Sequence, residues 1–110
     1  MKAAVFHPAA RAAIRSFPDD VRRELGKAIF DLQKGEILGM PVSRPMPSIG
    51  PGAAKLRIRD RSGIYRASYY ARSARGILLF HSFAKKKQAT PKRDLDLGKS
   101  RLKELLYEEI

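Results

Sequence analysis

The strongest chemical signal in the sequence is a row of cations within residues 55–70. Cationic and apolar side chains alternate along the first part of this segment, as Lys55, Leu56, Arg57, Ile58 and Arg59. Because successive side chains of a β-strand point to opposite faces, these cations would share one face of a strand. A hairpin turn at residues 60–63 would place Arg57 opposite Arg66, and like charges facing each other destabilise a sheet. We therefore expect this face to bind a polyanion.

The charge of the chain is concentrated around this segment. The 110 residues carry 23 lysines and arginines against 11 acids, for a net charge of +12. Residues 55–93 hold twelve of these cations and a single acid, Asp60, so the rest of the chain is nearly neutral. Such a concentration is typical of a protein that binds nucleic acid or an anionic membrane, and a solvated basic face is the alternative.

Composition excludes several kinds of site. The chain has no cysteine, so neither a disulfide nor a thiolate metal site is possible. With His7 and His81 as its two histidines, we expect no bound metal and no other cofactor. No apolar run approaches the roughly 20 residues of a membrane span, and the start of the chain lacks the apolar core of a signal peptide. We therefore expect a cytoplasmic protein that makes no membrane contact.

The elements that would position the cations form one α+β domain spanning residues 1–110. We expect an edge strand at residues 2–7, a helix that starts at Pro8 and a second helix that opens at Pro18. The second helix has a clear amphipathic stripe. Its members are Val21, Leu25, Ala28, Ile29 and Leu32. Four prolines exclude a helix or a central strand from residues 36–54, which are predicted to be a loop.

A third strand is predicted over residues 77–83, after a turn at residues 73–76. A register that places Ser68 opposite His81 would put the third strand's polar and aromatic side chains on the face of the arginines. These side chains are His81, Phe83 and Lys85. The predicted sheet is therefore antiparallel, with its chemistry on one face.

A last helix would begin after Thr90, a suitable N-cap, and Pro91, a suitable first residue. Its buried stripe would be Leu95, Leu102, Leu105 and Leu106. The predicted order is β-α-α-β-β-β-α, with the helices on one side of the small antiparallel sheet.

This order and several motifs resemble the RelE/ParE-like toxin superfamily, and within it the phage-derived HigB-like branch of type II toxin–antitoxin systems. The motifs are KLRIR, IYRASYY and LFHSFAKKKQATP, followed by the basic C-terminal helix. The resemblance spans nearly the whole chain. It implies a ribosome-dependent mRNA endonuclease that arrests translation and is held inactive by a cognate antitoxin. The antitoxin would be a helix-turn-helix protein from the adjacent gene, and operator DNA would be contacted only through it.

The resemblance also implies which residues act. The family's basic strand positions match Lys55 and Arg57, its Tyr-Arg arginine matches Arg66, and its cation after the last strand matches Lys86. The late tyrosine that some RelE members place against a base has no match near residues 91–93. His81 therefore becomes a candidate general base.

Cleavage of RNA through its 2′-OH requires a base, an acid for the leaving 5′ oxygen, and cations around the phosphorane. Guanidinium groups suit the third role because their fork matches two phosphate oxygens, so we assign it to Arg57 and Arg66. The base would be Lys55, because neighbouring arginines should depress its pKa, and His81 is the alternative because its ordinary pKa lies near neutrality. The remaining candidates would bind RNA, Phe83 by stacking on a base and the cations by charge. These cations are Arg59, Lys85 and Lys87.

Two other functions stay open at this point. The same basic sheet could serve a non-catalytic nucleic-acid-binding module, or a ParE-like gyrase poison with the same fold and no nuclease site. The dense cations together with His81 favour the nuclease over the ParE-like hypothesis. Each candidate also has a structural alternative. The arginines could be simple phosphate anchors, Lys55 a solvated surface residue, and residues 85–87 a source of general positive charge. His81 could be a packed strand residue and Phe83 part of the core.

Overall fold

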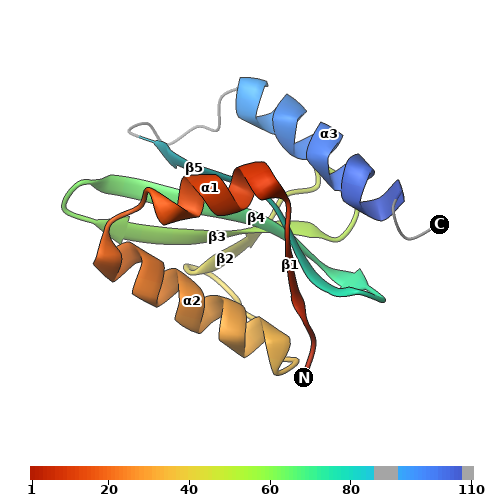
Figure 1. Ribbon diagram of the computed structural model, residues 1–110, viewed down its shortest axis with the longest axis horizontal. Coiled ribbons are helices and arrows are strands. Elements are labelled where there is room, and N and C mark those ends of the chain that lie inside the picture. Colours follow the sequence, from red (N-terminus) through yellow and green to blue (C-terminus); the bar gives the residue numbers. More distant parts are fainter. Residues whose placement is uncertain (86–91, 108–110) are drawn as a thin grey trace.

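The computed structural model describes residues 1–85 and 92–107, which form three helices and a five-stranded sheet (Figure 1). In chain order the elements are β1 (Ala4–Phe6), α1 (Pro8–Arg15), α2 (Asp19–Gln33), β2 (Ser43–Pro45), β3 (Ala53–Asp60), β4 (Gly63–Ser73), β5 (Gly76–Lys85) and α3 (Lys92–Tyr107). The strand order across the sheet is β1-β5-β4-β3-β2. The predicted α+β class is confirmed. The sheet is mixed rather than antiparallel, because β1 runs parallel to β5.

The two N-terminal helices begin and end where the sequence chemistry favours it. Pro8 is the first residue of α1, where its missing N–H breaks no helical hydrogen bond. Asp19 and Asp20 lie in the first turn of α2, next to the positive end of the helix dipole. Gly35 follows α2 with a φ of 90°, a left-handed conformation that favours glycine and ends the helix.

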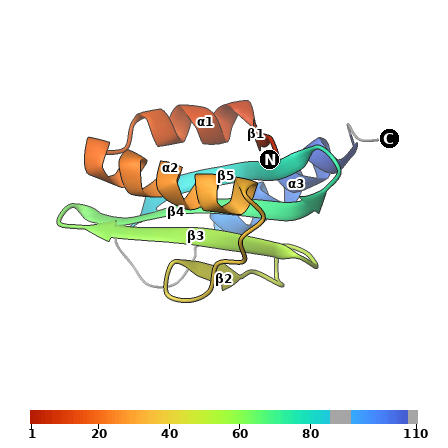
Figure 2. The same ribbon diagram turned by 90° about the horizontal axis from the view of Figure 1, so that it is seen from below.

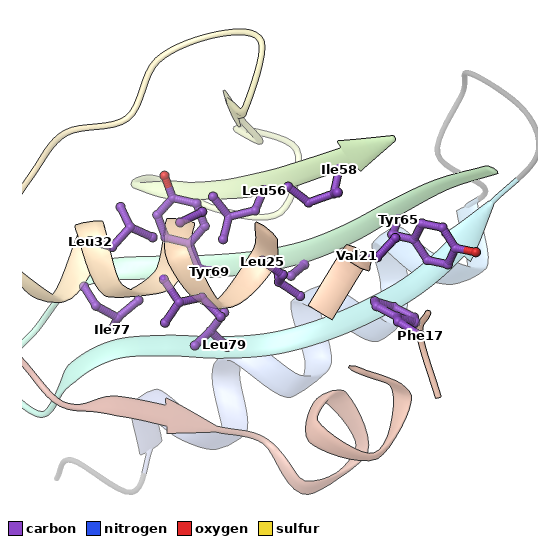
Figure 3. Close-up of a cluster of buried hydrophobic side chains, with 13 residues drawn as sticks. Phe17, Val21, Leu25, Leu32, Leu56, Ile58, Tyr65, Tyr69, Ile77 and Leu79 are labelled. Carbon is purple, nitrogen blue, oxygen red and sulfur yellow. The ribbon is translucent and has the colours of Figure 1, made fainter. Parts of the chain in front are cut away.

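Helices α1 and α2 cover one face of the sheet (Figure 2). All five residues of the stripe predicted for α2 are buried. They pack on the inward side chains of β3, β4 and β5 (Figure 3), which include Leu56, Ile58, Tyr65, Tyr69, Ile77 and Leu79. Full burial of such side chains stabilises a fold by roughly 1.5–3 kcal/mol each. This core fixes the strands, so that their alternate residues point away from α2.

Helix α3 packs on the opposite face, so the prediction that all helices lie on one side is wrong. Leu102 and Leu105 of its apolar stripe belong to a second buried cluster. The other members of this cluster are Met46, Ala53, Leu78 and Phe80. Alternation along β5 explains the placement, since Ile77 and Leu79 point toward α2 while Leu78 points toward α3. A strand that is apolar on both faces needs a cover on each.

The β3–β4 hairpin has the predicted register. Arg57 faces Arg66 as predicted, and the same register pairs Arg59 with Ile64 and Lys55 with Ser68. At the turn, Asp60 accepts hydrogen bonds from the backbone N–H and the hydroxyl of Ser62, both at 2.7 Å. The repulsive arginine pair inferred from the sequence is therefore a real feature of the sheet.

The β4–β5 register follows the prediction at one end and departs from it further along. Ser68 faces His81, as predicted, but Tyr69 faces Leu79, so the register shifts there and Phe80 has no cross-strand partner. Shifts of this kind re-aim side chains. Here Phe80 enters the α3 cluster and the neighbouring His81 also contacts α3. Strict alternation would have sent them to opposite faces.

The loop predicted over residues 36–54 contains β2, a strand that the sequence analysis missed. β2 lies at the edge of the sheet and pairs antiparallel with β3, with Arg44 facing Lys55. An edge strand tolerates Pro45 because a missing N–H on its outer side breaks no ladder. The strand adds another cation to the row that begins at Lys55.

Within residues 1–85 and 92–107, no helix has the length and apolar character needed to cross a bilayer.

Candidate functional site

Four cations from three adjacent strands share one face of the sheet, next to the part that α3 covers. We call Arg44, Lys55, Arg57 and Arg66 the basic floor. Arg44 faces Lys55 across β2 and β3, and Arg57 faces Arg66 across β3 and β4. The hydrophobic core on the far side of the sheet holds these strands, so the repulsive row is imposed by the fold.

Burial divides the basic floor into an inner and an outer part. Arg66 is 2% exposed and Lys55 is 6% exposed, whereas Arg57 is half-buried and Arg44 is exposed. Arg66 is therefore an interior residue of the sheet. Burial lowers the pKa of the Arg66 guanidinium, and the charges of Arg57 and Arg44 lower it further. An anion bound here would relieve the desolvation and the repulsion together.

His81 lies where the basic floor meets α3, and it is 3% exposed. Its Nε2 atom is 2.8 Å from Oδ1 of Asp94, and its Nδ1 atom is 2.6 Å from a terminal nitrogen of Arg101. An arginine only donates, so Nδ1 must accept and the ring proton must lie on Nε2, which donates to Asp94. The contacts thus define a neutral imidazole in one tautomer.

The surroundings of His81 predict how stability depends on pH. Burial lowers the pKa of His81 below its ordinary 6.5, Asp94 raises it, and Arg101 and Arg93 lower it again, with a net decrease. The unfolded chain therefore takes up a proton at a higher pH than the folded chain. The free energy of unfolding should fall as pH decreases below about 6.5 and level off below the folded-state pKa.

Denaturant unfolding in a pH series would measure this dependence in the wild type and in His81→Gln. The variant should have a flatter profile than the wild type below about pH 6.5. An identical slope in the two proteins would show that other groups cause it.

Phe83 and Arg59 border the basic floor. The ring of Phe83 lies 5.2 Å from the His81 ring at an angle of 31°, and Phe83 faces Arg66 across the strands. Phe83 is half-buried, and Arg59 is exposed near the hairpin turn. The structure therefore brings Lys55, Arg57, Arg66, His81 and Phe83 to one face, with Arg59 at its end.

The remaining predicted cations are only partly covered by the structure. Lys85 ends β5, and its backbone faces Ile64. Lys86 and Lys87 lie outside the described residues, as do Thr90 and Pro91. Their predicted roles stay predictions.

Three residues of the site were missed by sequence reasoning. Arg44 gave no signal, because β2 was not predicted. Asp94 and Arg101 lie seven residues apart in α3, which is two helical turns, so both can reach the same neighbour. Helical spacing could have shown that they share a face, but only the tertiary structure shows that His81 lies between them.

The metal-binding side chains do not gather in the described part of the chain. No three histidines, cysteines or acids lie close enough there to hold an ion. The charges that the site offers to a substrate come from its guanidinium and ammonium groups.

Comparisons with known proteins agree with this architecture. The family model of the phage-derived protein Gp49-like matches residues 12–103. The isolated RelE toxin of E. coli aligns over 100% of both chains, with a TM-score of 0.57 and 16% identity. A chain of the intact E. coli RelBE toxin–antitoxin complex aligns over 79% of this chain and 100% of that chain, with a TM-score of 0.51 and 17% identity. A search of curated proteins found no match.

Proposed function

Since the chain belongs to the phage-derived Gp49-like family and has the fold of the RelE-like toxins, we propose that it is the toxin of a type II toxin–antitoxin module and cuts mRNA on the ribosome. The predicted resemblance to the RelE/ParE-like superfamily is confirmed, while its HigB-like branch stays a prediction. The proposed partners are a cognate antitoxin, mRNA and the ribosome. The proposed compartment is the cytoplasm.

The observation that carries this proposal is the buried cation of the basic floor. Arg66 is almost fully enclosed, and Arg57, another cation, faces it across the strands. Burying a charge beside like charges is costly. A phosphate that is becoming more negative in a transition state would stabilise it. Such preorganised cations are an effective means of catalysing phosphoryl transfer.

The proposed reaction is cleavage of the RNA chain by its own 2′-OH, with one proton removed and one proton supplied. A base removes the proton of a 2′-OH, the 2′ oxygen attacks the neighbouring phosphorus, and the bond from phosphorus to the 5′ oxygen breaks. An acid then protonates that 5′ oxygen, which leaves a 2′,3′-cyclic phosphate. Arg57 and Arg66 would hold the pentacoordinate phosphorane, and one such contact contributes about 3 kcal/mol.

The groups that would accept and donate protons are side chains of this same face and of the segment after β5. Lys55 and His81 are the candidate bases, and Lys86 is the remaining catalytic cation that the resemblance implies. Phe83 would stack on a base next to the cleaved bond, and three further cations beyond the basic floor would hold the RNA backbone. These three cations are Arg59, Lys85 and Lys87.

The proposed mechanism predicts the chemistry of the products. Purified protein should cut mRNA on translating ribosomes, and the fragments should carry 2′,3′-cyclic or 3′-phosphate ends. Cutting should persist in excess chelator, with polyamines keeping the ribosomes intact, because guanidinium groups supply the charge that a divalent ion would otherwise provide. End-labelling of the fragments distinguishes the two kinds of terminus.

Three outcomes would contradict the proposal in different ways. Loss of cutting in chelator or 3′-hydroxyl ends would reject the 2′-OH mechanism. Binding of mRNA without cutting would favour the non-catalytic module. Arrest of DNA replication with translation unaffected would favour a ParE-like gyrase poison.

A further inference from the structure

The contacts of His81 raise a chemical problem for its use as a base. A neutral imidazole takes a proton through its unprotonated nitrogen, which here is Nδ1. That nitrogen is already occupied by the Arg101 guanidinium at 2.6 Å. His81 can act only after Arg101 has moved.

The other side of the ring is arranged as a general base requires. Asp94 accepts from Nε2–H at 2.8 Å, and His81 is buried. A carboxylate on the far nitrogen holds the imidazole in the correct tautomer and stabilises the imidazolium that forms when the near nitrogen takes a proton. Asp94 and His81 therefore have the relation of an orienting acid to its base.

We propose that Asp94 and Arg101 are positioning residues for His81: Asp94 keeps the ring proton on Nε2, and Arg101 covers Nδ1 until an RNA phosphate draws the guanidinium away. This inference rests on the proposed function. It assigns the role of base to His81 rather than to Lys55. It also makes the base available only when RNA is present.

The exchange of partners is favourable because of charge. In the free protein Arg101 donates to a neutral nitrogen, whereas a phosphate offers it two negatively charged oxygens in a geometry that matches the guanidinium fork. The phosphate therefore adds the attraction of opposite charges and a second hydrogen bond to what the neutral Nδ1 atom offers. Arg101 is partly exposed, so a phosphate can reach it without unfolding α3.

The charged groups around His81 come from two sides. Helix α3 contributes Asp94, Arg93 and Arg101, and the neighbouring strands contribute the basic floor. Asp94 raises the pKa of His81, whereas Arg101 lowers it. The two positioning residues therefore act on the base in opposite directions, which gives the proposal a distinctive signature.

The decisive variants are Asp94→Asn and Arg101→Gln, with Glu104→Gln as the matched control. Asparagine keeps an oxygen for Nε2–H but removes the charge, and glutamine keeps an N–H for Nδ1 but removes the charge. Glu104 lies on the same helix and pairs with the other histidine, His7, at 2.9 Å. The control thus makes the same acid-to-amide change beside a histidine outside the site.

The pH dependence of kcat/KM on ribosome-bound mRNA is the first readout. The acid limb, where the base loses activity by protonation, should move to lower pH in Asp94→Asn and to higher pH in Arg101→Gln, and should stay in place in Glu104→Gln. Asp94→Asn should also lower kcat by about 10²-fold with KM nearly unchanged, a size typical of general-base catalysis. Limbs that move together, or a limb unmoved by both variants, would overturn the proposal.

Nitrogen NMR of His81 is the second readout, and it does not require activity. The free wild type should show a proton on Nε2, and a 2′-O-methyl RNA oligonucleotide should change the Nδ1 signal while Nε2 keeps its proton. A proton on Nδ1 in the free protein, or a bound oligonucleotide that leaves Nδ1 unchanged, would overturn the inference. A wild type that cuts no mRNA rejects the proposed nuclease function, and the NMR response still decides whether RNA uncovers His81.

Discussion

If the chain is the proposed toxin, its expression without an antitoxin should arrest growth, and replacement of Arg66 by methionine is expected to relieve that arrest and to lower mRNA cleavage by roughly a hundredfold or more. The guanidinium of Arg66 is the innermost charge of the basic floor, at 2% exposure, so solvent cannot screen or replace it. Methionine retains much of the apolar stem and removes the charged guanidinium. The rate of cleavage on ribosomes and the growth of expressing cells would both be measured.

The same variant is expected to remain folded. Burial and two neighbouring arginines already disfavour the charged guanidinium, so its removal relieves desolvation and repulsion. Arg23→Met is the matched control, because Arg23 is an exposed arginine of α2 on the far side of the molecule, and the control should remain toxic. Full toxicity in a folded, well-expressed Arg66→Met protein would remove Arg66 from the mechanism.

Local patterns in the sequence were sufficient to predict the centre of the site. Alternation along residues 55–59 and the turn at residues 60–63 define the hairpin register, and that register alone places Arg57 opposite Arg66. The stripe of α2 was equally clear, since its five members recur at helical spacing. Both signals depend on residues that are close in the sequence, where geometry leaves few choices.

The features that could not be predicted depend on contacts between distant segments. The register shift beside Tyr69 has no signature in residues 68–81. Its stabilising contacts are made with α3, which lies further along the chain. The strand β2 is short and contains a proline, so local propensity argues against it and only pairing with β3 stabilises it. The Asp94–His81–Arg101 cluster depends on the register shift in β5 and on the packing of α3 against that strand. It could therefore not be predicted from local sequence patterns.

The antitoxin of the proposed module should bind the toxin in a way that depends on the basic floor. A concentration of cations at this face would bind RNA indiscriminately in a cell, so its inhibitor is expected to lay acidic side chains on the β3–β4 hairpin or to wedge beside it. An antitoxin that neutralises these cations would also stabilise the folded toxin, because it binds the folded chain and not the unfolded one. Association should therefore be fast at low salt, and its on-rate should fall by roughly tenfold or more as ionic strength rises.

Stopped-flow binding of the product of the neighbouring gene would test this with two charge reversals. Arg57→Glu reverses a charge on the floor, and Arg23→Glu makes the same change in net charge on the exposed side of α2. The first should lower the on-rate by about tenfold, whereas the second should have a much smaller effect, because steering depends on where the charge lies.

An equal loss in both variants would mean that net charge alone steers the encounter. An on-rate indifferent to salt, with binding unaffected by Arg57→Glu, would place the antitoxin elsewhere. The structure offers one such surface beside α2, a groove of about 310 Å³ whose lining includes Lys27, Leu38 and Val42. An antitoxin bound there would leave the basic floor open and would have to inhibit by blocking the ribosome instead. That result would reject coverage of the floor while leaving the proposed nuclease role of Arg66 untouched.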